Sequence, residues 1–185
     1  MTAAEAGTAS PGNHLPVQSG PTAPVFRSAM RQFVGSVSVV TTWHGDRPWG
    51  MTISSFTSVC IDPPTILVCL HGSTVTASHV RGCGRFGVNL LGRDQHHLSE
   101  LCAKPQADKY IDDYVVSSCN GSKELSPPRL AGSPVVLACR TIEQLSVGSH
   151  LVAIAAVEAV DLPDAAAPLL YGQGRYMHGV DLVRA

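Results

Sequence analysis

Residues 36–59 show the polar and apolar pattern of two adjacent β-strands. Residues 36–43 are rich in β-branched side chains, which favour strands. His44–Pro48 contains turn residues, and Trp49–Val59 predicts a second strand, so that the two form a hairpin. In that second strand Thr52 and Ser54 are spaced by two and share one face, whereas Met51, Ile53 and Ser55 share the other.

The hydrophobic pattern predicts elements along most of the remaining chain. Phe26, Ala29, Met30 and Phe33 recur at helical spacing, which predicts a helix that starts at Thr22 and ends at Gly35. The continuous apolar run Thr65–His71 predicts a strand buried on both faces. The other expected elements are a helix over Val75–Arg81 capped by Ser73 or Thr74, a strand over Gly84–Leu91, a helix from Asp94 to Ala103, strands over Pro134–Leu145 and Leu151–Asp161, and a hairpin of Leu169–Tyr171 with Arg175–Met177.

These elements predict a mainly β fold. Six or seven strands, mostly linked as hairpins, with two or three short helices between them, favour a small closed β-barrel with peripheral helices. Residues 1–23 are expected to form a disordered N-terminal tail, because they contain few large apolar side chains, and residues 24–185 to form one domain. The polar segment 104–133, rich in Pro, Gly and Ser, is expected to be a long excursion: a lid, a partner-contacting arm or a mobile loop.

Composition narrows the function classes. A net charge of −1 over 185 residues argues against nucleic acid as a partner. The apolar runs are too short to span a bilayer and the first residues do not resemble a signal peptide, so we expect a cytoplasmic protein that does not enter membranes. The six cysteines are expected to be free thiols, and the spacing of the eight histidines predicts no metal site.

Several polar residues are candidates for ligand binding. The hydroxyls of Thr52, Ser54 and Ser55, next to Gly50, suit either hydrogen bonding within a sheet or a ligand with a ring system and hydroxyl or phosphate groups. Ser73 and Thr76 lie where a strand meets a helix, and they suit either a plain cap or a phosphate seat.

Two further residues carry open alternatives. Asn89 interrupts an apolar strand, so its amide must bond either within the sheet or to the edge of a heteroaromatic ligand. His150 is either a surface turn residue or a partner for a carboxamide or a ring. No nucleophile–base pair or carboxylate pair stands out, so if the protein is an enzyme, a cofactor carries the reaction.

Taken in order, the segments resemble the flavin reductase family, whose members adopt the flavin-binding split β-barrel. The matching segments run from about Pro24 to Val180 and omit the 104–133 excursion. They are Phe26–Met30, Gly35–Val37, Val39–Thr42, Gly50–Val59, Asp62–Pro64, Ser73 with Thr76, Gly84–Leu91 with Gln95, Gly148–His150, Leu169–Tyr171 and Gly174–Tyr176.

The resemblance implies a homodimer, FMN or FAD, NADH or NADPH as hydride donor, and often a monooxygenase that receives the reduced flavin. It implies that Met51, Thr52, Ser54 and Ser55 line the isoalloxazine ring and ribityl chain. Ser73 and Thr76 would hold phosphate, Asn89 would contact the flavin, and His150 would act at the nicotinamide as the catalytic residue. Gly50, Phe86 and Tyr176, which lie in the matching segments, complete the predicted cofactor-binding set.

The chain departs from the family where Ser149 replaces a common Asp and where Cys60 replaces a common Ser. The leading hypothesis is an NAD(P)H:flavin oxidoreductase that supplies reduced flavin to a partner monooxygenase. The alternatives are a flavin-dependent oxidase or monooxygenase that acts directly on an organic substrate, and a flavin- or haem-binding split barrel without reductase activity.

Overall fold

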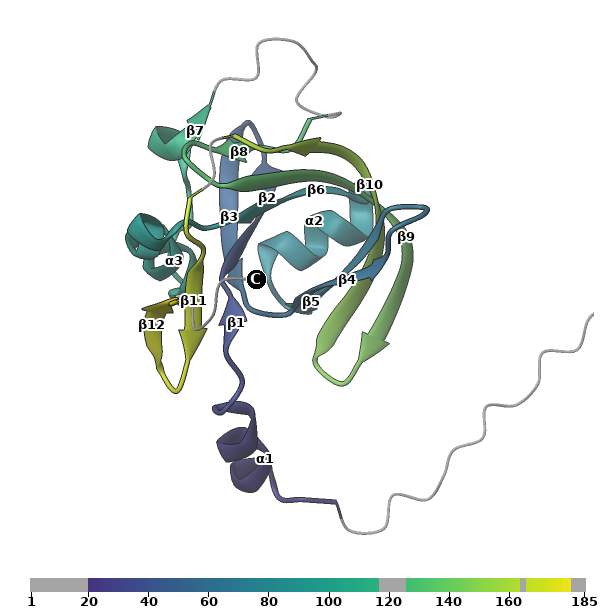
Figure 1. The fold of residues 1–185 in the computed structure, drawn as a ribbon. Helices are drawn as coiled ribbons and strands as arrows, with labels where there is room; N and C mark the ends of the chain where they lie inside the picture. The colour runs from purple at the N-terminus through teal and green to yellow at the C-terminus, as the bar shows by residue number, and fades with distance from the viewer. Residues whose placement is uncertain (1–19, 117–125, 164–165, 181–185) are drawn as a thin grey trace, which may run out of the picture.

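The computed structural model describes residues 20–116, 126–163 and 166–180, and these form a mainly antiparallel β structure (Figure 1). Seven strands make one sheet in the order β3-β2-β6-β9-β10-β5-β4. They are β2 (Ser38–His44), β3 (Arg47–Ile53), β4 (Phe56–Cys60), β5 (Thr65–His71), β6 (Arg85–Leu90), β9 (Val135–Val147) and β10 (His150–Asp161). The sheet curls around a central core, which confirms the expected split-barrel class.

Smaller elements surround this barrel. A three-stranded sheet contains β1 (Gly35–Ser36), β11 (Leu169–Gly172) and β12 (Arg175–His178), and a two-stranded sheet contains β7 (Val115–Val116) and β8 (Arg129–Leu130). The helices are α1 (Ala23–Met30), α2 (Val75–Cys83) and α3 (His96–Ala103), and the short 3-10 turns are η1 (Arg93–Gln95) and η2 (Asp112–Tyr114). No helix in the described part of the chain is long and apolar enough to cross a membrane.

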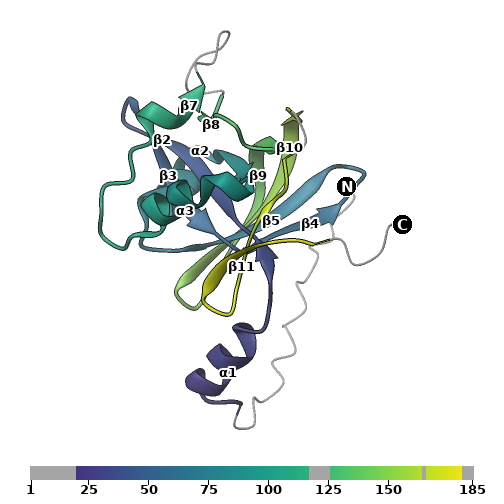
Figure 2. The same ribbon diagram turned by 60° about the vertical axis from the view of Figure 1, so that its left-hand side comes forward.

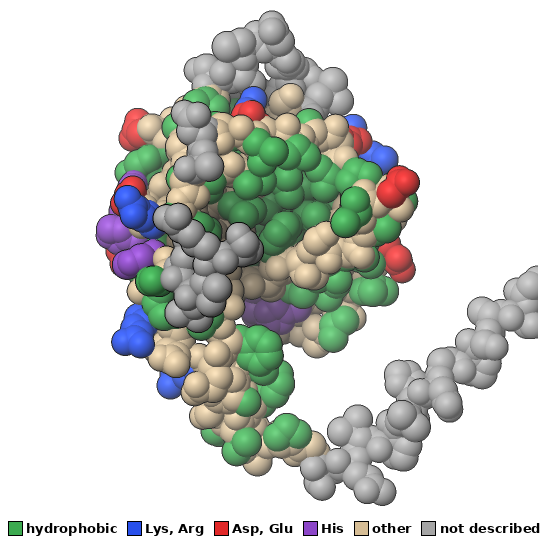
Figure 3. Space-filling model, viewed as in Figure 1, with side chains coloured by type: hydrophobic (Ala, Val, Ile, Leu, Met, Phe, Trp, Pro, Cys, Tyr) green, Lys and Arg blue, Asp and Glu red, His purple; other side chains and the backbone are tan. Residues whose placement is uncertain are grey.

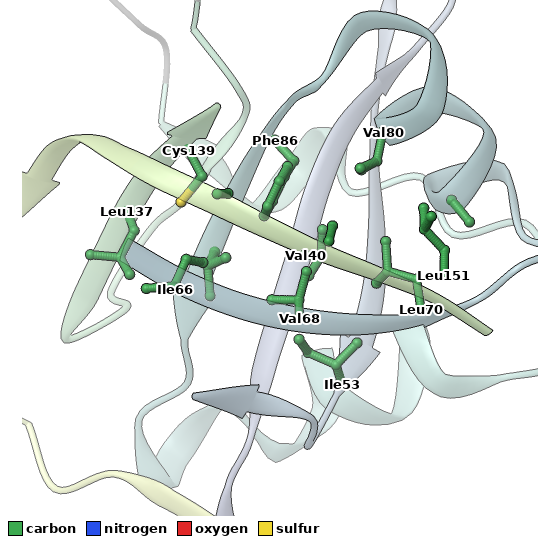
Figure 4. Close-up of a cluster of buried hydrophobic side chains, with 14 residues drawn as sticks. Val40, Ile53, Ile66, Val68, Leu70, Val80, Phe86, Leu137, Cys139 and Leu151 are labelled. Atoms are coloured by element: carbon green, nitrogen blue, oxygen red, sulfur yellow. The ribbon is translucent and has the colours of Figure 1, made fainter. Parts of the chain in front are cut away.

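The barrel interior is filled from both the sheet and α2. Figure 4 shows Val40, Val68 and Phe86 pointing into this interior, together with Val80 of α2. All four are fully buried, and burial of such a side chain stabilises the fold by about 1.5–3 kcal/mol. Because α2 lies across the barrel, its first turn is fixed relative to β3 and β5 (Figure 1).

A second core lies between the outer face of the sheet and α3. Val39 packs here against Leu98 and Cys102 of α3, whereas its neighbour Val40 packs inside the barrel. Successive residues of a strand point to opposite faces, so β2 is buried on both sides. This explains why residues 36–43 are β-branched or apolar at nearly every position.

The predicted hairpin is confirmed, but its second strand is shorter than expected. Ser38 pairs with Ile53 and His44 with Arg47 across β2 and β3. The strand then ends: Ser54 is a bend, and β4 starts at Phe56 on the opposite edge of the sheet, paired with β5. The single strand predicted for Trp49–Val59 is therefore wrong, because the chain changes its pairing partner at two small polar residues.

The predicted N-terminal helix exists but ends earlier, at Met30, and Gly35 belongs to β1. Thr22 is at the N-cap position and proline occupies the first turn, as expected, although no side chain caps the helix. None of its residues is buried in the single chain, and Figures 1 and 2 show α1 standing away from the barrel. Its apolar face therefore lacks a partner surface within the described residues. Residues 1–19 and 117–125, in the predicted tail and excursion, lie outside the described residues.

Candidate functional site

Two hollows adjoin the hydroxyl-rich end of β3. The larger hollow has a volume of about 640 Å³ and lies between β3, the first turn of α2 and the segment after α3. It is lined by Trp49, Met51, His71, residues 73–76, Ala103 and residues 105–109. The smaller hollow, of about 250 Å³, is lined by Val37, Thr52, Ile53, Ser54, Ser99, Ala103, Tyr171 and Tyr176. Ala103 borders both.

The N-terminus of α2 supplies the polar end of the larger hollow. The Thr74 hydroxyl caps the helix by accepting from the Ala77 N–H at 3.2 Å. Thr76, the second residue of the helix, is fully buried, and its hydroxyl has no hydrogen-bond partner within the described residues. A buried polar group without a partner is costly. Together with the free N–H groups of a helix start, it suits an anionic oxygen such as that of a phosphate.

Two histidines stand side by side next to this helix start. His71 ends β5 and His150 begins β10; the two are register partners, with ring centroids 5.3 Å apart. The Ser73 hydroxyl lies 2.9 Å from His71 Nδ1, and the Ser149 hydroxyl lies 3.1 Å from His150 Nδ1. Ser149, which stands where the family that the sequence resembles commonly has Asp, thus lies within hydrogen-bond distance of the His150 ring. His71 lines the larger hollow, and His150 lies immediately beside it.

The turn that carries His150 is tied to the turn after β5. The backbone N–H of Gly72 donates to the Ser149 carbonyl at 2.8 Å, and Arg81 of α2 donates to the Gly72 carbonyl at 2.7 Å. Gly148 has a φ of +55°, a conformation that favours glycine, so the turn between β9 and β10 needs only two residues. These contacts hold His150 in place without a carboxylate.

The far wall of the larger hollow is the segment after α3, which the sequence did not single out. The Gly50 N–H donates to the Lys109 carbonyl at 3.0 Å, and Tyr110 packs edge-on against Trp49 with ring centroids 5.0 Å apart. Lys109 lines the hollow and forms no ion pair with any residue that the structure describes. Desolvation lowers the pKa of its ammonium group. A desolvated cation in a hollow is a natural partner for an anionic ligand.

A sequence signal for this wall existed. Asp108, Lys109 and Tyr110 put two charges and an aromatic ring together within a segment that is otherwise rich in small and polar residues. Such a cluster is typical of a packed loop rather than of a loose linker. The segment 104–110 therefore contributes to the site. It belongs to the 104–133 excursion, which the sequence predicted as a lid, a partner-contacting arm or a mobile loop.

The predicted ligand-binding residues of 51–55 do not line one common surface. Met51 lines the larger hollow, whereas Thr52 and Ser54 line the smaller one with Tyr176. The Thr52 hydroxyl donates to the Ser99 carbonyl at 2.7 Å, and the Tyr176 hydroxyl donates to the Ser99 hydroxyl at 2.9 Å. The Ser55 hydroxyl donates to the Cys69 carbonyl at 2.7 Å. Thr52, Tyr176 and Ser55 thus already have partners within the protein.

Three predicted cofactor-binding residues have buried structural positions instead. Phe86 is fully buried in the barrel core. Asn89 is fully buried, and both ends of its amide bond within the protein: its nitrogen donates to the Val39 carbonyl and the Thr41 hydroxyl, and its oxygen accepts from the Leu130 N–H at 2.9 Å. Neither residue lines either hollow, so their contact with a ligand stays a prediction.

The third residue is Gly50, whose lack of a side chain serves packing rather than ligand access. A Cβ at this position would lie 2.6 Å from the Cys102 sulfur and 3.1 Å from a Val39 methyl group. Burial raises the pKa of the Cys102 thiol to about 12, so this sulfur is a neutral packing group. Gly50 therefore lets α3 approach β3 closely, and it positions the walls of both hollows indirectly.

These features fit a flavin nucleotide. The larger hollow has the size of a cofactor site, and its lining includes Trp49 and Met51, which suit a ring, and Thr76, whose buried hydroxyl suits a phosphate. No group of three or more potential metal ligands occurs among the described residues. The fold and site define a split-barrel protein with a hollow of the kind that holds a phosphate-bearing ring cofactor.

Comparison with known proteins agrees with this class. Residues 30–179 match the family model of the flavin reductase like domain, and the chain belongs to this family. It is 37% identical, over 84% of its length and 80% of the relative's, to the reductase component of 4-nitrophenol 4-monooxygenase/4-nitrocatechol 2-monooxygenase from Rhodococcus opacus. It is 30% identical to the NADH:FMN oxidoreductase of Rhodococcus erythropolis, over 82% and 79% of the two lengths.

Solved structures show the same relationship. The flavin reductase of styrene monooxygenase from Pseudomonas putida S12 superposes with a TM-score of 0.75 at 31% identity, covering 85% of this chain and 99% of the other.

Proposed function

We propose that this chain is an NAD(P)H:flavin oxidoreductase that transfers a hydride from reduced nicotinamide to FMN or FAD and supplies the reduced flavin to a partner monooxygenase. The proposal rests on the names of its relatives, on the family to which it belongs, and on one structural observation. That observation is the buried, unpartnered Thr76 hydroxyl at the start of α2, which faces a hollow of cofactor size.

In this proposal each end of the larger hollow has a distinct role. Ser73, Thr76 and the first N–H groups of α2 hold the flavin phosphate, and Trp49 and Met51 pack against the ring. A flavin held by these residues would supply the hydride-accepting chemistry. The Lys109 ammonium lies in the same hollow and stabilises the negative charge of the reduced ring or of the phosphate. Thr52, Ser54 and Tyr176 are proposed to contact the ribityl chain or the ring edge from the neighbouring smaller hollow, and Ser55 from the bend that follows β3.

A direct assay tests the function. NADH or NADPH is mixed with FMN or FAD and catalytic protein, and the loss of reduced nicotinamide absorbance is followed with each of the four pairs. The proposal requires flavin-dependent oxidation with at least one pair. An absorption spectrum of the purified protein separates the alternatives, because a haem carrier would show a Soret band and a resident flavoprotein would be yellow yet turn over free flavin poorly.

His150 is proposed to contact the nicotinamide. Replacing His150 with Ala is expected to raise the KM for the reduced nicotinamide about tenfold, because one hydrogen bond or ring contact of about 1–1.5 kcal/mol is lost. The KM for flavin should change less than twofold. Ser149→Ala should have a smaller effect of about twofold to threefold, since Ser149 only orients the imidazole. Equal nicotinamide KM values for wild type and His150→Ala would remove His150 from the site.

A homodimer is proposed from the unpartnered apolar surface. The exposed apolar side chains of α1 are Val25, Phe26 and Met30, followed by Phe33 and Val34. Figure 3 shows further hydrophobic side chains gathered in the middle of the barrel face. A helix of eight residues is not stable alone in water, so α1 requires a packing surface, and a second copy of the chain provides one.

Light scattering is expected to give about twice the 19.4 kDa mass of the chain. Phe26→Asp should weaken self-association at least tenfold, because it places a charge in a buried apolar contact of about 1.5–3 kcal/mol. Gln32→Asp, which adds the same charge at an exposed polar position nearby, is the matched control and should leave the dimer intact. A wild-type monomer that binds flavin would contradict the proposal.

The proposed location is the cytoplasm. The five described cysteines, Cys60, Cys69, Cys83, Cys102 and Cys139, are all free thiols, which supports a reducing compartment. Cys119 lies outside the described residues.

A further inference from the structure

A third hollow lies at the opposite end of α2 from the proposed flavin site. Its volume is about 370 Å³, and it shares no lining residue with the other two. Cys83, at the C-terminal end of α2, lies seven residues from Thr76, or about 10 Å along the helix axis. The hollow, called here the Cys83 hollow, is lined by Thr42, Trp43, Gly45, Asp46, His79, Cys83, Arg85 and Pro127.

A thiol and an imidazole meet in this hollow. Cys83 and His79 are four residues apart and therefore lie on one face of α2. The Cys83 sulfur is 2.7 Å from His79 Nε2, and it also accepts from the Arg85 backbone N–H at 3.4 Å. The thiol is exposed, so a reagent can reach it. Burial and the nearby His44 lower the pKa of His79, so its imidazole is neutral near pH 7 and can accept the thiol proton.

An independent feature of the same hollow indicates a ligand. Thr42 is only 1% exposed, and its hydroxyl has no hydrogen-bond partner within the described residues. Such a buried hydroxyl is satisfied when a ligand oxygen accepts from it. Trp43 provides an aromatic wall, and a volume of about 370 Å³ is large enough for a single-ring molecule.

We propose that Cys83 is a covalent attachment site for single-ring unsaturated carbonyl compounds of the quinone class, with His79 as the base. This proposal is independent of the flavin site. The ring stacks against Trp43, and a ring carbonyl oxygen accepts from the Thr42 hydroxyl. These contacts place the ring carbon beta to that carbonyl next to the Cys83 sulfur.

The addition balances without another reagent. The sulfur forms a bond to the ring carbon while the C=C π bond breaks, and that electron pair moves to the carbonyl oxygen. The thiol proton passes to His79 Nε2 and then to this oxygen. The hydrogen on the attacked carbon is then lost as a proton and taken up by the second carbonyl oxygen, which gives a hydroquinone thioether. The addition is redox-neutral overall: the two carbonyl carbons are each reduced by one electron, the attacked carbon is oxidised by two, and the sulfur keeps the oxidation level of a thiol.

The test exposes the full-length protein to 1,4-benzoquinone or to iodoacetamide, each below one equivalent, and maps the modified cysteines by peptide mass spectrometry. Cys60 is the internal control, because it is also exposed but its sulfur donates to the Asp62 carbonyl and has no imidazole partner. We expect Cys83 to react with both reagents about tenfold faster than Cys60, which reflects assistance by the base.

Two variants separate the roles of base and hollow. His79→Gln should lower the Cys83 rate to that of Cys60 with both reagents. Thr42→Val should lower the quinone rate several-fold and leave the iodoacetamide rate unchanged, since iodoacetamide has no ring to be held. Thermal melts establish that each variant is folded, and if His79→Gln is not, the Thr42→Val comparison decides. Equal rates at Cys83 and Cys60 in the wild type, or a Thr42→Val effect of the same size on both reagents, would overturn the proposal.

Discussion

Replacing Lys109 with glutamate is expected to raise the KM for FMN about a hundredfold. Among the residues that the structure describes, Lys109 is the only lysine or arginine that lines the larger hollow. At about 8 Å and an effective dielectric constant of about 20, a single charge pair is worth roughly 2 kcal/mol. Reversing the charge at position 109 removes one attraction to the flavin phosphate and adds one repulsion. After partial screening by salt, the two effects together weaken FMN binding by about 2.7 kcal/mol, which corresponds to a hundredfold higher KM.

Lys109→Gln is the matched control, because it removes the charge without reversing it, and it should give about a tenfold effect. Steady-state kinetics with varied FMN and a fluorescence titration of flavin binding provide two separate measurements. Both variants should have melting temperatures close to that of the wild type, because Lys109 forms no stabilising ion pair within the described residues. Its ammonium group is also partly desolvated, so the charge itself does not stabilise the fold. A Lys109→Glu protein that binds FMN as tightly as wild type would place the flavin elsewhere.

Replacing Asn89 with leucine is expected to destabilise the fold by about 2–4 kcal/mol. The two side chains have similar shapes, so the main loss is in hydrogen bonding. The Leu130 N–H would lose its acceptor, and the Thr41 hydroxyl and Val39 carbonyl would lose a donor. Each buried group left without a partner costs about 1–3 kcal/mol. Urea unfolding measures the change as a lower midpoint with an unchanged slope.

The same variant distinguishes the two roles that the sequence left open for Asn89. If its amide serves the fold, the KM for FMN measured well below the melting temperature should change less than twofold. A large rise in that KM with unchanged stability would instead return Asn89 to the flavin site.

The difference between prediction and structure at Asn89 has a physical cause. Sequence position alone shows that a polar side chain interrupts an apolar strand and must find partners. The amide oxygen of Asn89 accepts a hydrogen bond from the backbone N–H of Leu130, which lies 41 residues later in the chain. Leu130 belongs to the 104–133 segment that the sequence predicted as an excursion. No local pattern indicates which distant segment will fold back over a strand.

The hydroxyl-rich segment shows the same limit. Successive side chains of a strand point to opposite faces, so the sequence alone predicts that Met51 and its neighbour Thr52 lie on different faces of β3. The break at Ser54 and Ser55 does not follow, because it depends on β3 pairing with β2 while β4 pairs with β5 at the other edge of the sheet. Because of this break, Ser55 bonds to β5 and lines neither of the two hollows, whereas Met51 lines the larger one and Thr52 and Ser54 line the smaller one.

Patterns along the chain are enough to predict the mainly β class, the β2–β3 hairpin, the two-sided burial of β5 and the capped start of α2. Each of these depends on contacts between near neighbours in the chain, which periodicity and turn residues encode. Long-range packing, in contrast, brings Lys109 and Thr76 into one hollow, buries Phe86 and Asn89, and brings Thr42 into one hollow with His79 and Cys83. These outcomes depend on which strands pair and which loop packs over them. Strand pairing and loop packing are determined by the burial of the apolar surface of the whole domain, which no single segment of the sequence specifies.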